Sequence, residues 1–147
     1  MTNHSDERAD RVLPAVLFVC VKNGGKSQMA AGLMKHEAGV QVLVSSAGIK
    51  PGAAINALST EVLIDLGIDI SGEKPTLLTE DNMRAAGLVV VLGTEAQVPA
   101  VDGVAVEVWD TDEPSLRGIE GRDRMELVRD DIHARVRDLR DRLLPAD

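Results

Sequence analysis

The chain has 147 residues, a formal net charge of −8 and a single cysteine, Cys20. This length suits one domain, and one cysteine excludes an internal disulfide, which indicates a reducing, cytoplasmic setting. The acidity and the lack of a basic stripe argue against a nucleic-acid partner, and the apolar runs are too short to predict a membrane span. Residues 1–13 show no apolar period and are predicted to form a flexible arm, followed by one domain over 14–147.

The first half of this domain is predicted to alternate strands with helices. Residues 16–20 form an apolar strand, and residues 26–38 carry apolar positions at spacings that face one side of a helix. A second strand is expected over 41–45. Asn56 then provides a cap for a helix that Gly67 ends.

The second half continues the alternation. Thr79 is expected to cap a short helix, and residues 88–92 and 104–108 are β-branched runs that predict strands. The last helix carries charges on a solvated face. Its apolar positions, spaced by three and four, are Met125, Val128, Ile132, Val136, Leu139 and Leu143. This order predicts an α/β fold, a three-layer sandwich whose central four-stranded parallel sheet is flanked by helices.

Cys20 ends the first predicted strand, and a glycine-rich turn leads from it into a helix. In parallel sheets, ligands bind beyond the carboxyl ends of the strands. The N–H groups of such a turn and the positive end of the helix can bind a tetrahedral oxyanion and stabilise a thiolate. We therefore predict that Cys20 is a nucleophile inside an oxyanion-binding loop. The loop residues are Val21, Lys22, Asn23, Gly24, Gly25, Lys26 and Ser27.

Individual residues of this loop also have structural interpretations. A lone cysteine at a strand end is commonly a small buried hydrophobe, and Lys26 alone could be a solvated residue at a helix start. Asn23 can brace the loop, although Asn-Gly also occurs in many turns without function. The Ser27 hydroxyl can hydrogen-bond a thiolate or cap the helix. The two glycines tolerate positive φ, and the loop taken together favours the catalytic interpretation.

Acidic residues follow the last predicted strand, in the stretch Trp109-Asp110-Thr111-Asp112-Glu113-Pro114. A carboxylate here would lie at the same edge of the sheet as Cys20 and could protonate a leaving oxyanion. Acidic residues before a proline are also ordinary loop chemistry. The spacing leaves open which carboxylate would act.

In order along the chain, from about residue 15 onward, several blocks resemble the arsenate reductases of the low-molecular-weight tyrosine phosphatase fold. The blocks are Val16-Leu17-Phe18-Val19-Cys20, Ser27-Gln28-Met29-Ala30-Ala31, Ser45-Ser46-Ala47-Gly48, Gly67-Ile68-Asp69-Ile70-Ser71, Leu88-Val89-Val90-Val91-Leu92 and the stretch from Trp109-Asp110 to Pro114. The loop matches the phosphatase spacing Cys-x5-Arg-Ser with Lys26 in place of arginine. Its Lys-Asn-Gly-Gly-Lys-Ser version resembles the single-cysteine branch that uses mycothiol.

This resemblance implies a reaction. Arsenate would bind in the loop against Lys26 and Ser27, a site that phosphate or sulfate could also occupy. The Cys20 thiolate would then attack arsenic. Asp112 or Glu113, of which Glu113 stands beside the proline, would protonate the departing oxygen. Mycothiol would take up the arseno group, and a redoxin would free arsenite. The resemblance therefore implies three partners, which are arsenate, mycothiol and a redoxin. Mycothiol is expected as a co-substrate, and no tightly bound cofactor or metal is expected.

An external thiol is also required by the electron count. Thioredoxin-coupled members of the family carry two further cysteines after the third strand, and residues 92–99 of this chain contain neither. Reducing arsenate takes two electrons, which one cysteine cannot supply by closing a disulfide within the chain.

Two other functions fit the same residues. A protein tyrosine phosphatase would form a phosphocysteine on the same thiolate, but Lys26 lacks the planar fork of arginine. The aromatic residues of the chain are Phe18 and Trp109. The chain therefore has few aromatic side chains to line a pocket for the aromatic ring of a substrate. The second alternative is a non-catalytic oxyanion-binding module, against which the joint presence of Cys20, Ser27 and the acidic stretch argues. An oligomer is compatible with the sequence.

Overall fold

The computed structural model describes residues 13–145. The predicted arm over 1–13 falls outside this range except for Leu13, so it stays a prediction. The elements are β1 (Ala15–Cys20), α2 (Lys26–Ala38), η1 (Gly39–Gln41), β2 (Leu43–Gly48), α3 (Ala57–Ile64), α4 (Glu80–Ala86), β3 (Leu88–Leu92), β4 (Ala105–Trp109), η2 (Pro114–Arg117) and α5 (Gly121–Leu143). Strands and helices alternate as predicted, and η1 and η2 are short 3-10 turns.

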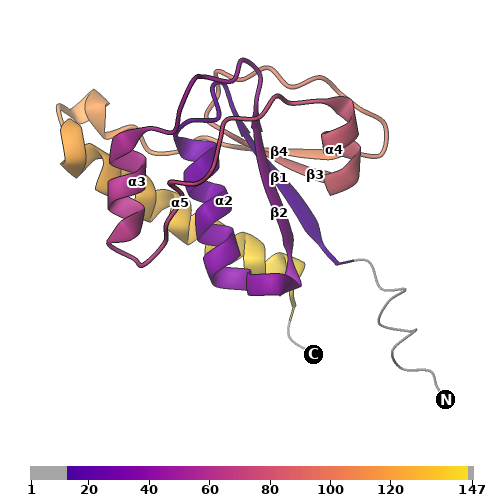
Figure 1. Ribbon diagram of the computed structural model, residues 1–147. Coiled ribbons are helices and arrows are strands. Elements are labelled where there is room, and N and C mark those ends of the chain that lie inside the picture. Colours follow the sequence, from indigo (N-terminus) through magenta and orange to yellow (C-terminus); the bar gives the residue numbers. More distant parts are fainter. Residues whose placement is uncertain (1–12, 146–147) are drawn as a thin grey trace.

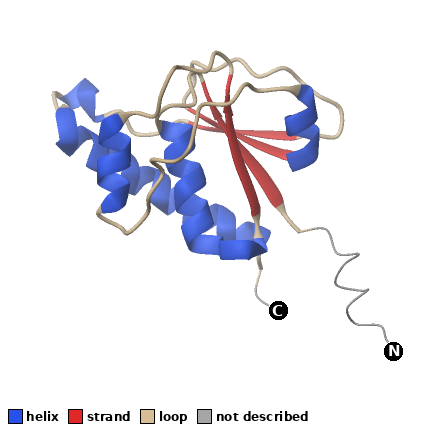
Figure 2. Cartoon of the chain, viewed as in Figure 1, coloured by secondary structure: helices blue, strands red, loops and turns tan. Residues whose placement is uncertain are grey.

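The four strands form one parallel sheet in the order β2-β1-β3-β4. Helices α2, α3 and α5 cover one face and α4 lies on the other, as Figure 1 and Figure 2 show. The predicted three-layer α/β fold with a four-stranded parallel sheet is therefore confirmed. In this topology β1 lies inside the sheet, with β2 and β3 as its neighbours.

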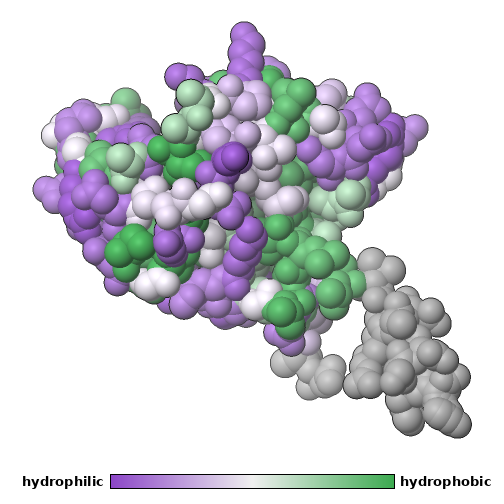
Figure 3. All heavy atoms as spheres, in the orientation of Figure 1, coloured by the Kyte–Doolittle hydropathy of each residue, from purple (hydrophilic) through white to green (hydrophobic). Residues whose placement is uncertain are grey.

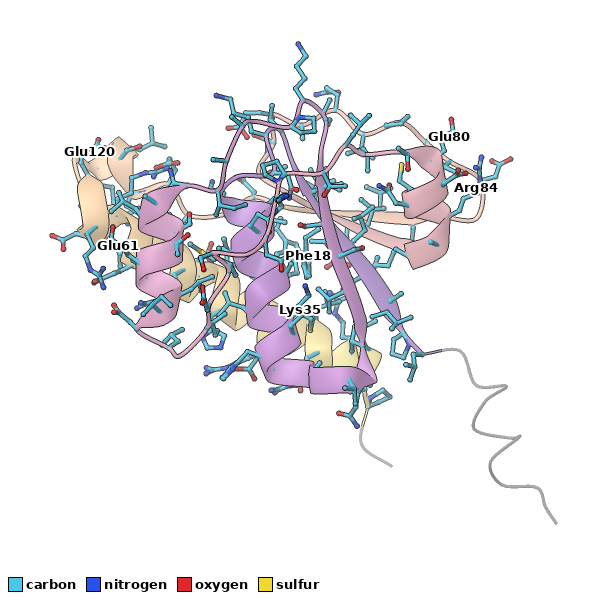
Figure 4. The ribbon with its side chains drawn as sticks, viewed as in Figure 1. Phe18, Lys35, Glu61, Glu80, Arg84 and Glu120 are labelled. Carbon is cyan, nitrogen blue, oxygen red and sulfur yellow. The ribbon has the colours of Figure 1, made fainter. Side chains whose placement is uncertain are left out.

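β1 is buried on both faces because its side chains alternate between two cores. Val16 and Phe18 pack with α2 and α5, whereas Leu17 and Val19 pack with Met83 of α4, and all five are fully buried. Figure 4 shows Phe18 between α2 and the sheet. The same alternation turns the next even-numbered residue, the cysteine that ends the strand, toward the α2 layer. The thiol therefore faces the start of α2.

Several boundaries differ from the sequence prediction: β1 begins one residue earlier, β2 extends to Gly48 rather than to 45, and β4 is shifted by one residue to Ala105–Trp109. The second strand begins at Leu43 rather than at 41, because Gly39 adopts a φ of 58° after α2 and a 3-10 turn occupies residues 39–41. α3 starts after Asn56, whose side chain accepts a hydrogen bond from the Ser59 N–H, as a cap should. It ends at Ile64, before the glycine expected to stop it.

The two ends of the sheet have different surfaces. Exposed apolar side chains, Leu13, Val40 and Leu43, gather near the amino ends of β1 and β2, and Figure 3 shows an apolar area toward the end of the sheet where the chain enters. The loops at the opposite, carboxyl end hold the candidate site. Within residues 13–145, none of the helices has the combination of length and hydropathy that a membrane-spanning helix needs.

Candidate active site at the carboxyl end of the sheet

The loop after β1 is fixed to the segment after β2 by backbone hydrogen bonds. The N–H groups of Lys50, Gly52 and Asn56 donate to the carbonyl oxygens of residues 21, 22 and 24, at 2.8, 2.9 and 2.6 Å. The two segments approach closely at Gly48, where a Cβ atom would lie 2.9 Å from the backbone nitrogen of Asn23. Gly48 was not among the predicted site residues and stands in one of the blocks that carry the family resemblance. Its lack of a side chain lets the loop pack against β2.

Two donors converge on the sulfur of Cys20. The backbone N–H of Asn23 donates to Sγ at 3.2 Å, and the Ser27 hydroxyl oxygen lies 2.9 Å from Sγ. That hydroxyl already accepts a hydrogen bond from Asn23 Nδ2 at 2.7 Å, so its own proton is free to point at the sulfur. Both interactions favour a negatively charged sulfur. The side chain of Cys20 is partly exposed, so a small anion can reach it.

Asn23 is the residue that holds this arrangement together. It is fully buried and adopts a φ of 53°, a left-handed conformation that asparagine tolerates better than most residues. Its side-chain oxygen accepts hydrogen bonds from the Thr76 N–H at 2.9 Å and from Gln28 Nε2 at 3.1 Å. Neither Thr76 nor Gln28 was among the predicted site residues. Both stabilise the loop through their hydrogen bonds to Asn23.

The loop ends at the amino terminus of α2. Among the described residues, no side chain caps the first turn of this helix, whose N-cap is Gly25. Its first N–H groups therefore keep their hydrogen-bonding capacity for a ligand. The seven predicted oxyanion-binding residues lie together on this one loop, and their contact with an anion stays a prediction.

Lys26 connects this loop to the acidic loop after β4. Its ammonium nitrogen donates to Thr111 Oγ1 at 2.9 Å and lies 4.0 Å from Glu113 Oε1. Thr111 is buried, with 7% of its surface exposed. The two sequence motifs, predicted separately, are thus brought together through one lysine.

Glu113 and Asp112 are both paired with arginines. Arg124 donates two hydrogen bonds of 2.7 Å to Glu113. These bonds, with smaller contributions from Ser115, lower the pKa of Glu113 to about 2. Arg117 donates to both oxygens of Asp112, at 2.7 and 3.1 Å, and lowers its pKa. In this conformation both groups are carboxylates, so either would have to leave its arginine before it could act as an acid. The general acid role stays a prediction.

The acidic loop is held in place by α5. Asp131 accepts a hydrogen bond from the Asp112 N–H at 2.8 Å, and Arg135 donates to the Asp110 carbonyl at 3.0 Å. The charges of this helix were predicted to form a solvated face, which is incomplete because Arg124, Asp131 and Arg135 bind the loop. No spacing in the sequence marks these pairs. Within residues 13–145, no group of three His, Cys, Asp or Glu side chains is placed to hold a metal ion.

Comparisons with known proteins match nearly the whole described chain. The family model of the low molecular weight phosphotyrosine protein phosphatases matches residues 15–145. Arsenate reductase 1 of Staphylococcus epidermidis is 33% identical over 126 residues, which are 82% of this chain and 91% of that protein.

Solved structures share the fold. A thioredoxin-dependent arsenate reductase of Corynebacterium glutamicum superposes with a TM-score of 0.77 at 33% identity, over 95% of this chain and 66% of that one. This chain therefore spans about two thirds of its length. A tyrosine phosphatase of Erwinia amylovora superposes with a TM-score of 0.74 at 20% identity, over 92% of this chain and 96% of that one. The second likeness shows a common fold alone.

Proposed function

Because this chain belongs to the low molecular weight phosphotyrosine protein phosphatase family, we propose that it is an arsenate reductase whose nucleophile is Cys20. The observation that carries the proposal is the sulfur itself, which lies within hydrogen-bond distance of the Asn23 N–H and the Ser27 hydroxyl beside the uncapped start of α2. The identity to Staphylococcus arsenate reductase over most of both chains supports arsenate as the substrate. We place the reaction in the reducing cytoplasm, where a lone thiol stays reduced.

The first step is substitution at arsenic. The N–H groups of the loop and the Lys26 ammonium bind the arsenate oxygens, and the Cys20 thiolate forms a sulfur–arsenic bond. One oxygen leaves as water after taking up a proton. Asp112 and Glu113 are the candidates to provide this proton, and each would first have to separate from its arginine. Arsenic remains in its pentavalent state throughout this step.

The second stage uses an external thiol. The sequence contains one cysteine, so the thioredoxin dependence of the Corynebacterium protein is not carried over. Mycothiol attacks arsenic and replaces Cys20, which leaves as a thiolate. A redoxin thiol then attacks the mycothiol sulfur, a disulfide forms, and the electron pair of the sulfur–arsenic bond stays on arsenic as arsenite. What supports mycothiol over other thiols is the loop from Lys22 to Ser27, and arsenate detoxification is the resulting role.

A tyrosine phosphatase is the second candidate, because the same thiolate could attack phosphorus and the family model carries that name. Lys26 argues against it, since a lysine binds an anion as a point charge and lacks the two parallel donors of arginine. Hydrolysis of a small aryl phosphate measures this activity directly.

The test is arsenite formation by the purified protein with mycothiol and a mycothiol-dependent redoxin, with glutathione and glutaredoxin, and with thioredoxin and its reductase. We expect arsenite with the first system, and Cys20→Ser should remove it while phosphate binding persists. The matched control is Ser59→Ala, a buried serine whose hydroxyl contacts Met125. Aryl phosphate hydrolysis faster than arsenite formation would favour the phosphatase. Anion binding without product in any thiol system would favour a binding module.

A further inference from the structure

The ammonium group of Lys26 is held from the acidic loop at two points, Thr111 Oγ1 at 2.9 Å and Glu113 Oε1 at 4.0 Å. An ammonium has three donors in a tetrahedral arrangement. The acidic loop takes one of these donors through Thr111 and lies near the ammonium a second time through the longer ion pair with Glu113, which leaves donors for an anion in the loop that begins at Cys20. We propose that Thr111 is a positioning residue that aims Lys26 at the bound oxyanion.

A lysine at this position needs such a partner. Arginine presents a rigid, planar fork that orients itself on two oxygens, whereas lysine is a point charge at the end of a flexible four-carbon stem. Ordering that stem costs conformational entropy each time an anion binds. A hydrogen bond that orders the stem beforehand removes part of this cost and should tighten anion binding.

Thr111 is itself well fixed. Its β-branched side chain is buried, and a threonine has restricted rotation about χ1. The residues on either side are bound to α5, through the Asp112 N–H to Asp131 at 2.8 Å and through the Asp110 carbonyl to Arg135 at 3.0 Å. The hydroxyl that meets Lys26 therefore belongs to a segment anchored on both sides.

Glu113 does not cancel the charge of Lys26, because it has a second cation of its own. Arg124 makes two hydrogen bonds of 2.7 Å to this carboxylate, shorter than its 4.0 Å separation from Lys26. Two positive charges and one negative charge are present in the three side chains of Arg124, Glu113 and Lys26. A net positive charge thus remains for an incoming oxyanion.

The experiment compares Thr111→Val, which keeps the shape and removes the hydroxyl, with Thr111→Ser, which keeps the hydroxyl. Inorganic phosphate is the binding probe, titrated by calorimetry, and arsenate KM and kcat are measured in parallel. We expect Thr111→Val to weaken phosphate binding about tenfold and to raise the arsenate KM more than it lowers kcat. Thr111→Ser should stay within about twofold, because the donor's partner is retained.

A double-mutant cycle with Lys26→Met separates positioning from structural support. If Thr111 acts through Lys26, adding Thr111→Val to Lys26→Met should change phosphate binding by less than about twofold. An unreduced tenfold loss in that background would show a structural role and overturn the proposal. Thr60→Val, which removes a hydroxyl bonded to the Asn56 carbonyl, is the matched control and should leave binding unchanged.

Two further outcomes would also overturn the positioning role. One is unchanged or tighter phosphate binding by Thr111→Val, since tighter binding would mean that Thr111 draws Lys26 away from the anion. The other is failure of the unaltered protein to bind phosphate. The kinetic part rests on the proposed function, but the phosphate cycle does not. Phosphate binding without arsenite formation in any thiol system would refute the reductase while the cycle still decides the role of Thr111.

Discussion

The two loops that meet at the carboxyl end of the sheet are built in different ways. In the loop from Cys20 to Ser27, the side-chain contacts at the sulfur join residues within seven positions of one another. In the acidic loop after β4, the fixing contacts come from Arg124, Asp131 and Arg135, which lie 11 to 25 residues further along the chain. Around the sulfur the first loop is shaped by its own residues, with further support from the segment after β2 and from Thr76, whereas the second loop depends on a helix.

This difference assigns the chemistry to the loop from Cys20 to Ser27 and structural support to the carboxylates of the acidic loop. Hydrogen bonds of the first loop converge on the sulfur, so a change there should alter both stability and reactivity. The carboxylates of the acidic loop are occupied by Arg117 and Arg124, so a change of either carboxylate should alter mainly stability. Substitutions in the two loops can test this division.

Asn23→Ala should have the largest effect. The substitution removes the hydrogen bond that Asn23 donates to Ser27 and those that it accepts from Gln28 and Thr76, and it places alanine at a positive φ. We expect the free energy of unfolding to fall by about 3 kcal/mol and arsenite formation to fall at least about a hundredfold. Urea unfolding and single-turnover arsenite formation measure the two effects.

Asn23→Gly is the matched control, because glycine accepts the positive φ without strain. It should recover about 1 kcal/mol of stability relative to the alanine variant and little of the activity. Native stability in both variants would show that the side-chain network does not hold the loop.

Lys26→Arg changes the residue that joins the two loops. An arginine fork can contact two oxygens of an anion, so hydrolysis of p-nitrophenyl phosphate should rise by about tenfold. Arsenite formation should change less, because its rate also depends on the external thiol. A fall in hydrolysis would indicate that the space beside Thr111 and Glu113 admits a lysine but not an arginine.

Ser27→Ala tests the hydroxyl that contacts the sulfur at 2.9 Å. Loss of one hydrogen-bond partner should make the sulfur less reactive, so alkylation by iodoacetamide should slow roughly three- to tenfold. Ser59→Ala, whose hydroxyl meets Met125 instead, should leave alkylation unchanged. Equal rates in wild type and Ser27→Ala would mean that the Asn23 N–H and the helix suffice.

The same contrast explains what the sequence could predict. The strand, the cysteine and the glycine-rich turn lie within a dozen residues, so their spacing was enough to predict an oxyanion-binding loop, and the alternation of strands and helices along the chain predicted the parallel α/β fold that has this loop at its carboxyl edge. Charge and periodicity along α5 indicated a solvated face, but the pairing of Arg124 with Glu113 depends on how α5 packs against the sheet. No pattern in the sequence marked Thr111, because the role of its hydroxyl depends on the contact with Lys26 in the folded chain. Packing at Gly48 depends likewise on two segments that meet in space.

Glu113→Gln should have the smallest effect on the reaction and a measurable one on stability. Arg124 lowers the pKa of Glu113 from 4.5 to about 2, so the folded state favours the carboxylate. The resulting stabilisation is complete above about pH 4.5 and is lost as the pH falls toward about 2. Glu113→Gln should therefore lower the free energy of unfolding by roughly 1 to 2 kcal/mol near pH 7, allowing for solvent screening of this partly exposed pair.

That difference between wild type and Glu113→Gln should shrink as urea unfolding is repeated at lower pH, whereas a loss of packing alone would not depend on pH. Arsenite formation near pH 7 should fall less than about threefold, because a carboxylate held by Arg124 has no proton to donate. A loss of a hundredfold or more with native stability would instead identify Glu113 as the general acid. The acidic loop would then have to release Arg124 during turnover, and its ion pair would be part of the reaction rather than support for it.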